Sequence, residues 1–307
     1  MLKEKKIIFM GTPEYATVIF ERLLENDYNI IALFTQPDKP IGRKQISTPP
    51  SIKQFSLKNG LSMPIYQPST LKEKSIQNII FELKPDIIIV AAYGQILPKE
   101  VLDIAPCVNM HASILPQYRG ASPIQQSLLN DDSFSGVTAM KMDTGLDSGD
   151  ILAYKYIRIN KNTVVSELFN SLALCAAQLT LEVLERLDSI LPKKQNLSLV
   201  SQCKKITKQD ALVTFDNAID LYNKYRAFKS WPEIFLDTGL KIKECFLNDN
   251  QSVNKDGKIL LIEPRSIVVA CTFGSVKIIS VQPPSKKQMN VVDYIRGKRL
   301  KIGDTFS

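Results

Sequence analysis

The sequence predicts an α/β fold, with a doubly wound parallel sheet in the N-terminal domain and a small β-barrel after it. Apolar segments of strand length alternate with amphipathic segments of helix length as far as residue 188. The composition then changes near Ser189, and short strands with turn residues dominate the remainder. With 307 residues, the chain is long enough for two cores. We therefore expect domains at residues 1–188 and 207–307, joined by a linker at 189–206.

The first domain is expected to begin with a strand at Lys5–Met10, followed by a helix that Pro13 opens. The run Asp86–Ala92 is apolar without alternation, which is typical of a strand buried on both faces of a parallel sheet. Further strands are expected at Ile30–Phe34, Val108–His111 and Val137–Met142, and further helices at Ser51–Asn59, Glu73–Leu83 and Thr163–Leu187.

The second domain should contain one helix, Ala218–Phe228, and several short strands separated by turns such as Asp237–Gly239. The strands are expected at Ile234–Leu236, Leu240–Leu247, Lys258–Ile262, Ile267–Cys271 and Val276–Val281. This pattern favours a barrel of the OB type, a fold that commonly binds nucleic acid.

The formal net charge of +8 is unevenly distributed along the chain. Residues 1–188 hold 19 lysines and arginines against 20 acidic residues, a balance of −1, and residues 189–307 hold 20 against 11, a balance of +9. Such an asymmetry points to a polyanionic partner, nucleic acid first. The alternative is a basic surface that serves solubility alone.

Several classes of protein are disfavoured. No uninterrupted apolar run approaches the roughly 18 residues that span a bilayer. Ile7–Met10 is too short for the apolar part of a signal peptide, so we expect a cytoplasmic protein without membrane contact. The five cysteines form no CxxC pair, and a single histidine cannot complete a Cys/His zinc site. We therefore expect no metal. Nothing in the sequence demands an oligomer, so a monomer is expected.

His111 is the only histidine of the chain, and it ends the expected strand Val108–His111. Open α/β sheets bind their ligands at the carboxyl ends of strands. Asn109 lies two residues earlier, so both side chains should emerge on the same face of the strand. Asparagine donates a hydrogen bond without titrating, whereas imidazole gains and loses a proton near neutral pH. The alternative is a structural histidine that a backbone carbonyl satisfies.

Asp147 lies in the polar loop Met142–Asp150, where two glycines permit a tight excursion. Its carboxylate can lean back toward the sheet and orient the imidazole of His111. An Asx-turn explains such a loop equally well. With Asn109, these residues would supply a donor, a titrating group and a carboxylate, and no serine or cysteine nucleophile is required. That set suits direct transfer of an acyl-type group to an attacking amine.

Two further loops are candidate binding elements. Gln36–Pro50 is long and basic, and its Arg43 and Lys44 could meet a phosphate backbone, although a solvated loop is the alternative. Tyr93–Pro98, together with Ile114–Pro116, could wall a pocket for a flat heterocycle, or could simply pack in the core. The first loop lacks GxGxxG spacing and the chain has no Walker A motif, so a dinucleotide or nucleoside triphosphate cofactor is unsupported.

Taken together, these segments resemble the methionyl-tRNA formyltransferase family over nearly the whole chain. The resemblance rests on Phe9–Pro13, Phe34–Arg43, Ala91–Pro98, Val108–Pro116, Tyr118–Gln125, Gly145–Asp150, Arg226–Phe228 and Trp231–Pro232. Where the family usually has Gly after the histidine and Leu before Leu-Pro, this chain has Ala112 and Ile114. Both changes are small and apolar, so the pocket should survive. The Asn-His-Asp set alone is shared with other formyltransferases that use 10-formyltetrahydrofolate.

The resemblance implies a Rossmann-like catalytic domain joined to an OB-type barrel. It implies transfer of the formyl group of 10-formyltetrahydrofolate to the α-amino group of methionine on initiator methionyl-tRNA, in translation initiation. Asn109 and His111 would stabilise the oxyanion, and Asp147 would hold His111 and help to move the proton. The folate site would be lined by Ser113, Ile114, Leu115 and Pro116, with Tyr93, Gly94 and Ile96 nearby. Arg43 and Lys44 would belong to the loop that meets the tRNA.

Two other functions remain open at this stage. The same chemistry could act on a small amine, such as a phosphoribosyl glycinamide or a nucleotide-linked aminosugar, which would need no basic barrel. Alternatively, the chain could be a non-catalytic nucleic-acid-binding module on this fold, in which case His111→Ala would change nothing measurable.

Overall fold

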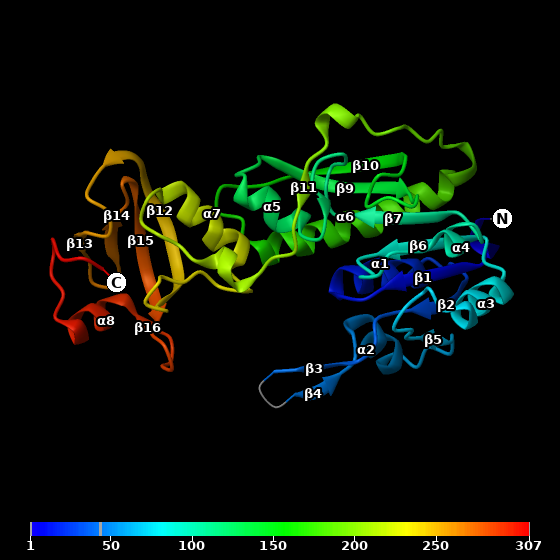
Figure 1. Ribbon diagram of the computed structural model, residues 1–307, viewed down its shortest axis with the longest axis horizontal. Helices are drawn as coiled ribbons and strands as arrows, with labels where there is room; N and C mark the ends of the chain where they lie inside the picture. Colours follow the sequence, from blue (N-terminus) through cyan, green and yellow to red (C-terminus); the bar gives the residue numbers. More distant parts are fainter. Residues whose placement is uncertain (1, 43–44, 307) are drawn as a thin grey trace. The chain divides into compact units, whose positions relative to one another are not determined.

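The computed structural model describes residues 2–42 and 45–306, which form two compact units (Figure 1). Unit 1 consists of Met1–Pro123, Phe134–Arg158 and Phe169–Lys204. Unit 2 consists of Ile124–Ser133, Ile159–Leu168 and Lys205–Ser307. Two short segments that lie between stretches of unit 1 in the sequence thus belong to unit 2. The division at 1–188, 189–206 and 207–307 stays a prediction.

Unit 1 is built on a seven-stranded sheet of order β10-β9-β7-β6-β1-β2-β5. The strands are β1 (Ile7–Gly11), β2 (Ile30–Phe34), β5 (Ile65–Tyr66), β6 (Ile87–Ala91), β7 (Cys107–His111), β9 (Phe134–Lys141) and β10 (Ile151–Arg158). The expected parallel arrangement is confirmed for β7, β6, β1, β2 and β5. At the other edge, β9 runs antiparallel to β7, and β10 antiparallel to β9. The chain returns directly from β9 to β10, and a hairpin connection requires antiparallel strands.

Helices cover both faces of this sheet, as a doubly wound fold requires. On one face lie α1 (Glu14–Glu25) and α6 (Val165–Arg186): the ring of Phe20 in α1 lies 5.3 Å from that of Phe9 in β1, and Tyr15 meets Phe169 at 6.1 Å. On the other face, α3 (Lys74–Leu83) and α4 (Lys99–Leu102) join one apolar cluster with side chains of β1, β2, β6 and β7. Helix α2 (Ser51–Lys58) packs against α1.

Helix α6 and the residues that follow it, Val165–Ser189, are long and apolar enough to cross a membrane by length and composition alone. A little over half of the apolar window is buried inside the protein, at 56%. The core helix of a soluble protein passes the same test of length and composition.

Several short elements frame the loops of unit 1. A hairpin of β3 (Lys39–Ile41) and β4 (Ile46–Thr48) lies within the loop Gln36–Pro50 and projects from the unit (Figure 1). Strand β8 (Arg119–Gly120) pairs in parallel with β11 (Gln202–Cys203). The short helix α5 (Pro123–Leu129) follows β8 and, apart from Pro123, belongs to unit 2.

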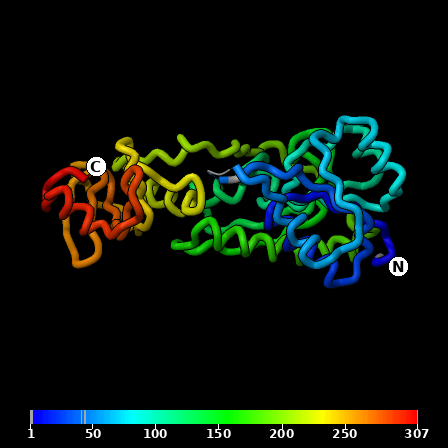
Figure 2. Tube along the Cα trace, turned by 90° about the horizontal axis from the view of Figure 1, so that it is seen from below, coloured from blue at the N-terminus to red at the C-terminus, as the bar shows by residue number. Residues whose placement is uncertain are grey.

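Unit 2 contains the expected antiparallel β domain. Its strands are β12 (Lys241–Val253), β13 (Ile259–Ile262), β14 (Ile267–Ala270), β15 (Phe273–Gln282) and β16 (Met289–Asn290). They pair in the order β12-β15-β14-β13, with β16 also on β15, and helix α8 (Val291–Lys298, red in Figure 2) contacts β15 and β16. The strand expected at Ile234–Leu236 is wrong: Phe235 makes only single bridges to Leu212 and Lys241. The OB-type topology stays a prediction.

Helix α7 (Ala218–Phe228) is confirmed at its expected bounds, and the side chain of Asn217 caps it by accepting from the N–H of Ile219. Its Arg226 is only 1% exposed. The guanidinium donates to the Thr163 carbonyl at 3.1 Å, to Asp131 at 2.8 Å and to Asn223 at 3.2 Å. These contacts hold the two early segments of unit 2 against its helix.

Candidate active site

His111 lies at the carboxyl end of β7 in unit 1, with a side chain that is 8% exposed. Its Nε2 is 3.0 Å from the carbonyl oxygen of Tyr118, and its Nδ1 is 3.7 Å from Oδ2 of Asp147. A carbonyl oxygen can only accept, so the proton on the neutral ring belongs on Nε2. This leaves Nδ1 turned toward the carboxylate of Asp147.

Asn109 and Asp147 complete a cluster around the imidazole. The Nδ2 of Asn109 donates to Oδ1 of Asp147 at 3.4 Å, and the N–H of Gly120 donates to Oδ2 at 2.8 Å. The side chain of Asp147 is 12% exposed. The structure therefore brings together Asn109, His111 and Asp147, the three residues that the sequence suggested as catalytic.

The carboxylate reaches His111 through a loop that folds back on the sheet. Because β9 is antiparallel to β7, its last residue, Lys141, pairs with Val108 near the start of β7, whereas His111 pairs with Thr138. The loop between β9 and β10 must then return along β7 for Asp147 to meet His111. Proximity thus comes from the path of the loop and not from two strands that end at one edge.

Two residues beside the imidazole adopt left-handed backbone conformations although neither is glycine. Tyr118 has φ of +59° and Asp147 has φ of +49°. Non-glycine residues adopt this region rarely, and such conformations persist where the surrounding structure holds them. They turn the Tyr118 carbonyl and the Asp147 carboxylate toward the same ring.

The segment expected to line a folate pocket follows directly after His111. Ser113 and Leu115 are each 1% exposed, and the Ser113 hydroxyl donates to the carbonyl of Gln117 at 2.7 Å. Thr138 donates to the carbonyl of Ser113 and accepts from the N–H of Leu115, which fixes the segment against β9. Pro116 is buried, and Ile114 is partly exposed. Any ligand here would therefore meet backbone groups and the side chain of Ile114.

The second segment expected at this pocket, Tyr93–Pro98, has both buried and exposed residues. The side chain of Tyr93 is buried in the apolar cluster, and its hydroxyl has no hydrogen-bond partner among the described residues. Gly94 is exposed with φ of +85°, and Ile96 is 76% exposed. Arg43 and Lys44, the expected tRNA contacts, lie outside the described residues.

Three groups at the site were missed by reasoning from sequence. The carbonyl of Tyr118 and the N–H of Gly120 are backbone groups, which every such residue carries, so residue type gives no signal. The third is Gln195, whose side chain is buried beside the Asp147 loop. It lay in a segment expected to be a linker, and only its contacts reveal it.

The thiol of Cys203 lies beside the Tyr118 carbonyl, but its surroundings do not favour a nucleophile. Cys203 is 6% exposed, and its Sγ lies 3.4 Å from the carbonyl oxygen of Tyr118. Burial, together with the negative charge of Asp147, raises the pKa of this thiol. A thiol held protonated is a poor nucleophile. Within the described ranges, no three His, Cys, Asp or Glu side chains gather in a way that could hold a metal ion.

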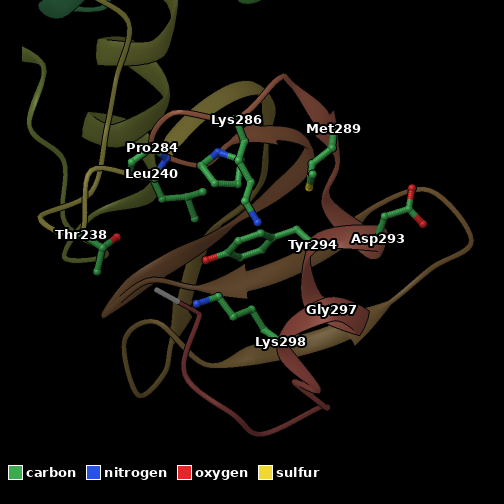
Figure 3. A pocket seen from close by; sticks show the side chains of 10 residues that line it. Thr238, Leu240, Pro284, Lys286, Met289, Asp293, Tyr294, Gly297 and Lys298 are labelled. Carbon is green, nitrogen blue, oxygen red and sulfur yellow. The ribbon is translucent and has the colours of Figure 1, made fainter.

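Unit 2 has a surface pocket of its own between α8 and the turn after β15 (Figure 3). Lys286 and Lys298 line it together with Tyr294, and Leu240, Pro284 and Met289 add apolar walls. Neither amine has an ion pair among the described residues. The pocket combines positive charge with an aromatic surface, which suits contact with phosphate and with flat groups.

Comparison with known proteins identifies both halves of the chain. Residues 5–184 match the formyl transferase family, and residues 205–299 match the C-terminal domain of formyl transferases. The methionyl-tRNA formyltransferase of Nitratiruptor is 54% identical over 98% of this chain and 99% of its own length. That of Sulfurimonas denitrificans is 53% identical over 98% of this chain and all of its own length.

Solved structures share the fold at lower identity. An N-formyltransferase from Helicobacter canadensis, bound to folinic acid and dTDP-3-aminofucose, aligns with a TM-score of 0.68 and 20% identity over 91% of this chain and 99% of its own. HypX from Aquifex aeolicus, in complex with tetrahydrofolic acid, aligns with a TM-score of 0.63 and 14% identity over 95% of this chain. The chain spans 46% of the HypX chain.

Proposed function

This chain belongs to the methionyl-tRNA formyltransferase family, and from that premise we propose that it formylates the α-amino group of methionine on initiator methionyl-tRNA. We propose 10-formyltetrahydrofolate as the donor. The observation that carries this proposal at the site is the contact of Asn109, His111 and Asp147 on one face of β7, beside backbone loops that could receive the donor.

In the proposed reaction, the methionyl amine attacks the formyl carbon of the donor. A new C–N bond forms, the carbonyl oxygen becomes negative, and the bond from carbon to N10 of the folate then breaks. The amine loses a proton and N10 gains one, so the reaction needs proton transfer but no oxidant or metal. The protein must therefore stabilise an oxyanion and accept a proton.

Each member of the cluster suits one of these tasks. The amide of Asn109 is a permanent donor for the oxyanion, and a protonated His111 adds a second donor from Nδ1. Asp147 balances the charge of that imidazolium and can accept the proton that the amine releases. The Tyr118 carbonyl holds Nε2 at 3.0 Å, so Nδ1 stays turned toward the site and the ring cannot present Nε2 there instead without losing this bond.

For the donor, we propose the surface formed by Ser113–Pro116 and Tyr93–Ile96. Exposed Ile96 and partly exposed Ile114 offer apolar contact, and exposed Gly94 leaves its backbone open to a ring edge. The Tyr93 and Ser113 side chains are buried, so their contribution would come through position and backbone.

For the tRNA, we propose contacts from the β3–β4 hairpin and from unit 2. The hairpin carries Arg43 and Lys44 between its strands, and Lys53 and Gln67 both hydrogen-bond Asp38 at its base. Unit 2 includes most of the region with the +9 balance. We further propose that the chain works as a cytoplasmic monomer, in keeping with its substrate.

The test is a formyl-transfer assay with 10-formyltetrahydrofolate that offers charged initiator methionyl-tRNA, charged elongator methionyl-tRNA and free methionine in parallel. Formylation of the initiator tRNA, with little on free methionine, is the expected result. Transfer to free amines at a similar rate would favour the small-amine alternative, and no transfer to any acceptor would overturn the proposed chemistry.

A further inference from the structure

The side chain of Gln195 uses all of its hydrogen-bonding capacity next to the Asp147 loop. Its Nε2 donates to the carbonyl oxygens of Asp147 and Gly149, each at 2.8 Å. Its Oε1 accepts from Nε and Nη2 of Arg119, at 3.0 and 2.7 Å. Carbonyls only accept and guanidinium only donates, so these partners fix the orientation of the amide. The residue is 8% exposed, and each contact is therefore shielded from water.

Among the described residues, the loop that Gln195 holds makes backbone bonds to the sheet only at its ends, and near His111 the other external bonds reach the Asp147 side chain, from Gly120 and Asn109. The last backbone bonds to the sheet are those from Lys141 to the carbonyl of Asp150 and from Met142 to the carbonyl of Cys107, and the loop then leaves the sheet. The bonds that Asp143 makes to Gly145 and Ser148 are internal to the loop. The left-handed backbone at Asp147 also needs external support. Gln195 grips the carbonyl of that residue directly.

Arg119, the other partner of Gln195, belongs to the second loop at the site. It lies between Tyr118, whose carbonyl accepts from His111, and Gly120, whose N–H donates to Asp147. Gln195 therefore joins the two loops that meet around the imidazole. The neighbouring chain reinforces this link, because Ser201 accepts from the N–H of Tyr118 through its hydroxyl and from that of Arg119 through its carbonyl.

We propose that Gln195 is a positioning residue for formyl transfer, which sets the Asp147 carboxylate against His111 by tying the 142–150 loop to Arg119. The inference rests on the proposed function. Gln195 lies between the two ranges that match the formyl transferase family, residues 5–184 and 205–299. Its role follows from its contacts alone.

Gln195→Glu is the sharpest test because it keeps the shape and the contact with Arg119 while removing the donor to both carbonyls. We expect kcat to fall by up to about a hundredfold, the scale of a misplacement of about 1 Å, with KM for both substrates unchanged. Hydrogen exchange in residues 142–150 should quicken. Gln202→Glu is the matched control, since Gln202 is exposed on the same segment, and it should keep the wild-type rate and exchange.

A Gln195→Glu variant that keeps the wild-type kcat and loop exchange would overturn the proposal. Wild-type protein without transfer activity would instead overturn the proposed function, which separates the two failures. If Gln195→Glu does not fold, Arg119→Met tests the same tie from the other side, because it removes both donors to Oε1 and leaves the carbonyl contacts. A lower kcat at constant KM supports the tie, and a full kcat in this variant contradicts it.

Discussion

At the scale of single residues, the bond from His111 to the Tyr118 carbonyl predicts a tautomer. The neutral ring should carry its proton on Nε2, because a lone pair at that position would face a carbonyl oxygen 3.0 Å away. Nitrogen-15 NMR of the imidazole measures this directly, and the chain has one histidine, so no assignment is needed. Predominance of the Nδ1–H form would contradict the geometry of the site.

Asp147→Asn should separate the carboxylate's charge from its structural bond. The side-chain oxygen of asparagine can still accept from the N–H of Gly120, so folding and tRNA affinity should change little. Loss of the proton acceptor should lower kcat by about 10²- to 10⁴-fold.

Asp143→Asn is the control in the same loop, because Asp143 is exposed and its bonds to Gly145 and Ser148 need only an acceptor oxygen. Steady-state formylation and tRNA binding, measured on both variants, decide the matter. If Asp147→Asn retained most of the wild-type rate, the role assigned to the carboxylate would be wrong.

Part of this site could be predicted from residue types, and part could not. A lone histidine, an asparagine two residues before it and an aspartate in a glycine-containing loop all carry chemical information. The Tyr118 carbonyl and the Gly120 N–H carry none, because the backbone is the same at every such position. Gln195 is a common surface residue type, and its function depends on a burial that only the folded chain shows.

At the scale of elements, the residue pattern of a segment predicted its structure correctly where that structure depends on the segment alone. Strand β2 and helix α7 lie at the expected bounds, since an unbroken apolar run defines the first and Asn217 caps the second. The direction of β9 and the return of its loop depend on pairing between distant segments, which periodicity does not encode. For the same reason, the apolar segment Ile234–Leu236 forms no strand, because only single bridges reach it.

The ion pair between α7 and the 124–133 segment predicts a stability change in unit 2. Asp131→Asn should destabilise this unit by about 3 kcal/mol, because the guanidinium of Arg226 is buried and would lose its counter-charge. Thermal and urea unfolding of the variant measure this loss. Lys161→Ala is the control: it removes the other cation that pairs with Asp131, and its side chain is 84% exposed, so little stability should be lost.

The same pair should respond to acid in a defined direction. Although partial burial opposes it, hydrogen bonds from Arg226 and Lys161 lower the pKa of Asp131 below the ordinary value of 3.8 that it has in the unfolded chain. The stabilisation that the Asp131 carboxylate contributes is therefore complete when the pH is above its unfolded pKa. It is lost as the pH falls through the lower pKa of the folded state. The difference in stability between wild type and Asp131→Asn should accordingly shrink only in strong acid. A difference that already vanishes between pH 7 and pH 5 would contradict this.

At the scale of the whole molecule, the uneven distribution of charge predicts how tRNA binding depends on salt. The excess of +9 lies in residues 189–307, whereas the proposed catalytic residues lie in the nearly neutral first part. Phosphate contacts release counterions, so affinity for tRNA should fall steeply with salt. For about four phosphate contacts, the loss between 50 and 200 mM salt would be on the order of 50- to 150-fold. A flat response would remove the electrostatic argument.

The pocket on unit 2 allows this electrostatic contribution to be assigned to particular residues. If Lys286 and Lys298 each neutralise one phosphate, Lys286→Ala/Lys298→Ala should reduce the slope of log Kd against log salt by about 1.4 to 1.8. Their amines are free of ion pairs within the described ranges, so the loss should not disturb the fold. Lys72→Ala/Lys74→Ala is the control of equal charge, on exposed positions in and before α3.

Because Lys286 and Lys298 lie in unit 2, their substitution leaves unit 1 intact. In the pocket variant, kcat at saturating tRNA should therefore stay at the wild-type value while KM for tRNA rises. An equal fall in slope for both double variants would mean that net charge acts at long range, without a contact at the pocket. An unchanged slope in the pocket variant alone would place the phosphate contacts on other cations of unit 2. A selective fall would show that the walls around Tyr294 meet the nucleic acid, since net charge is the same in both variants.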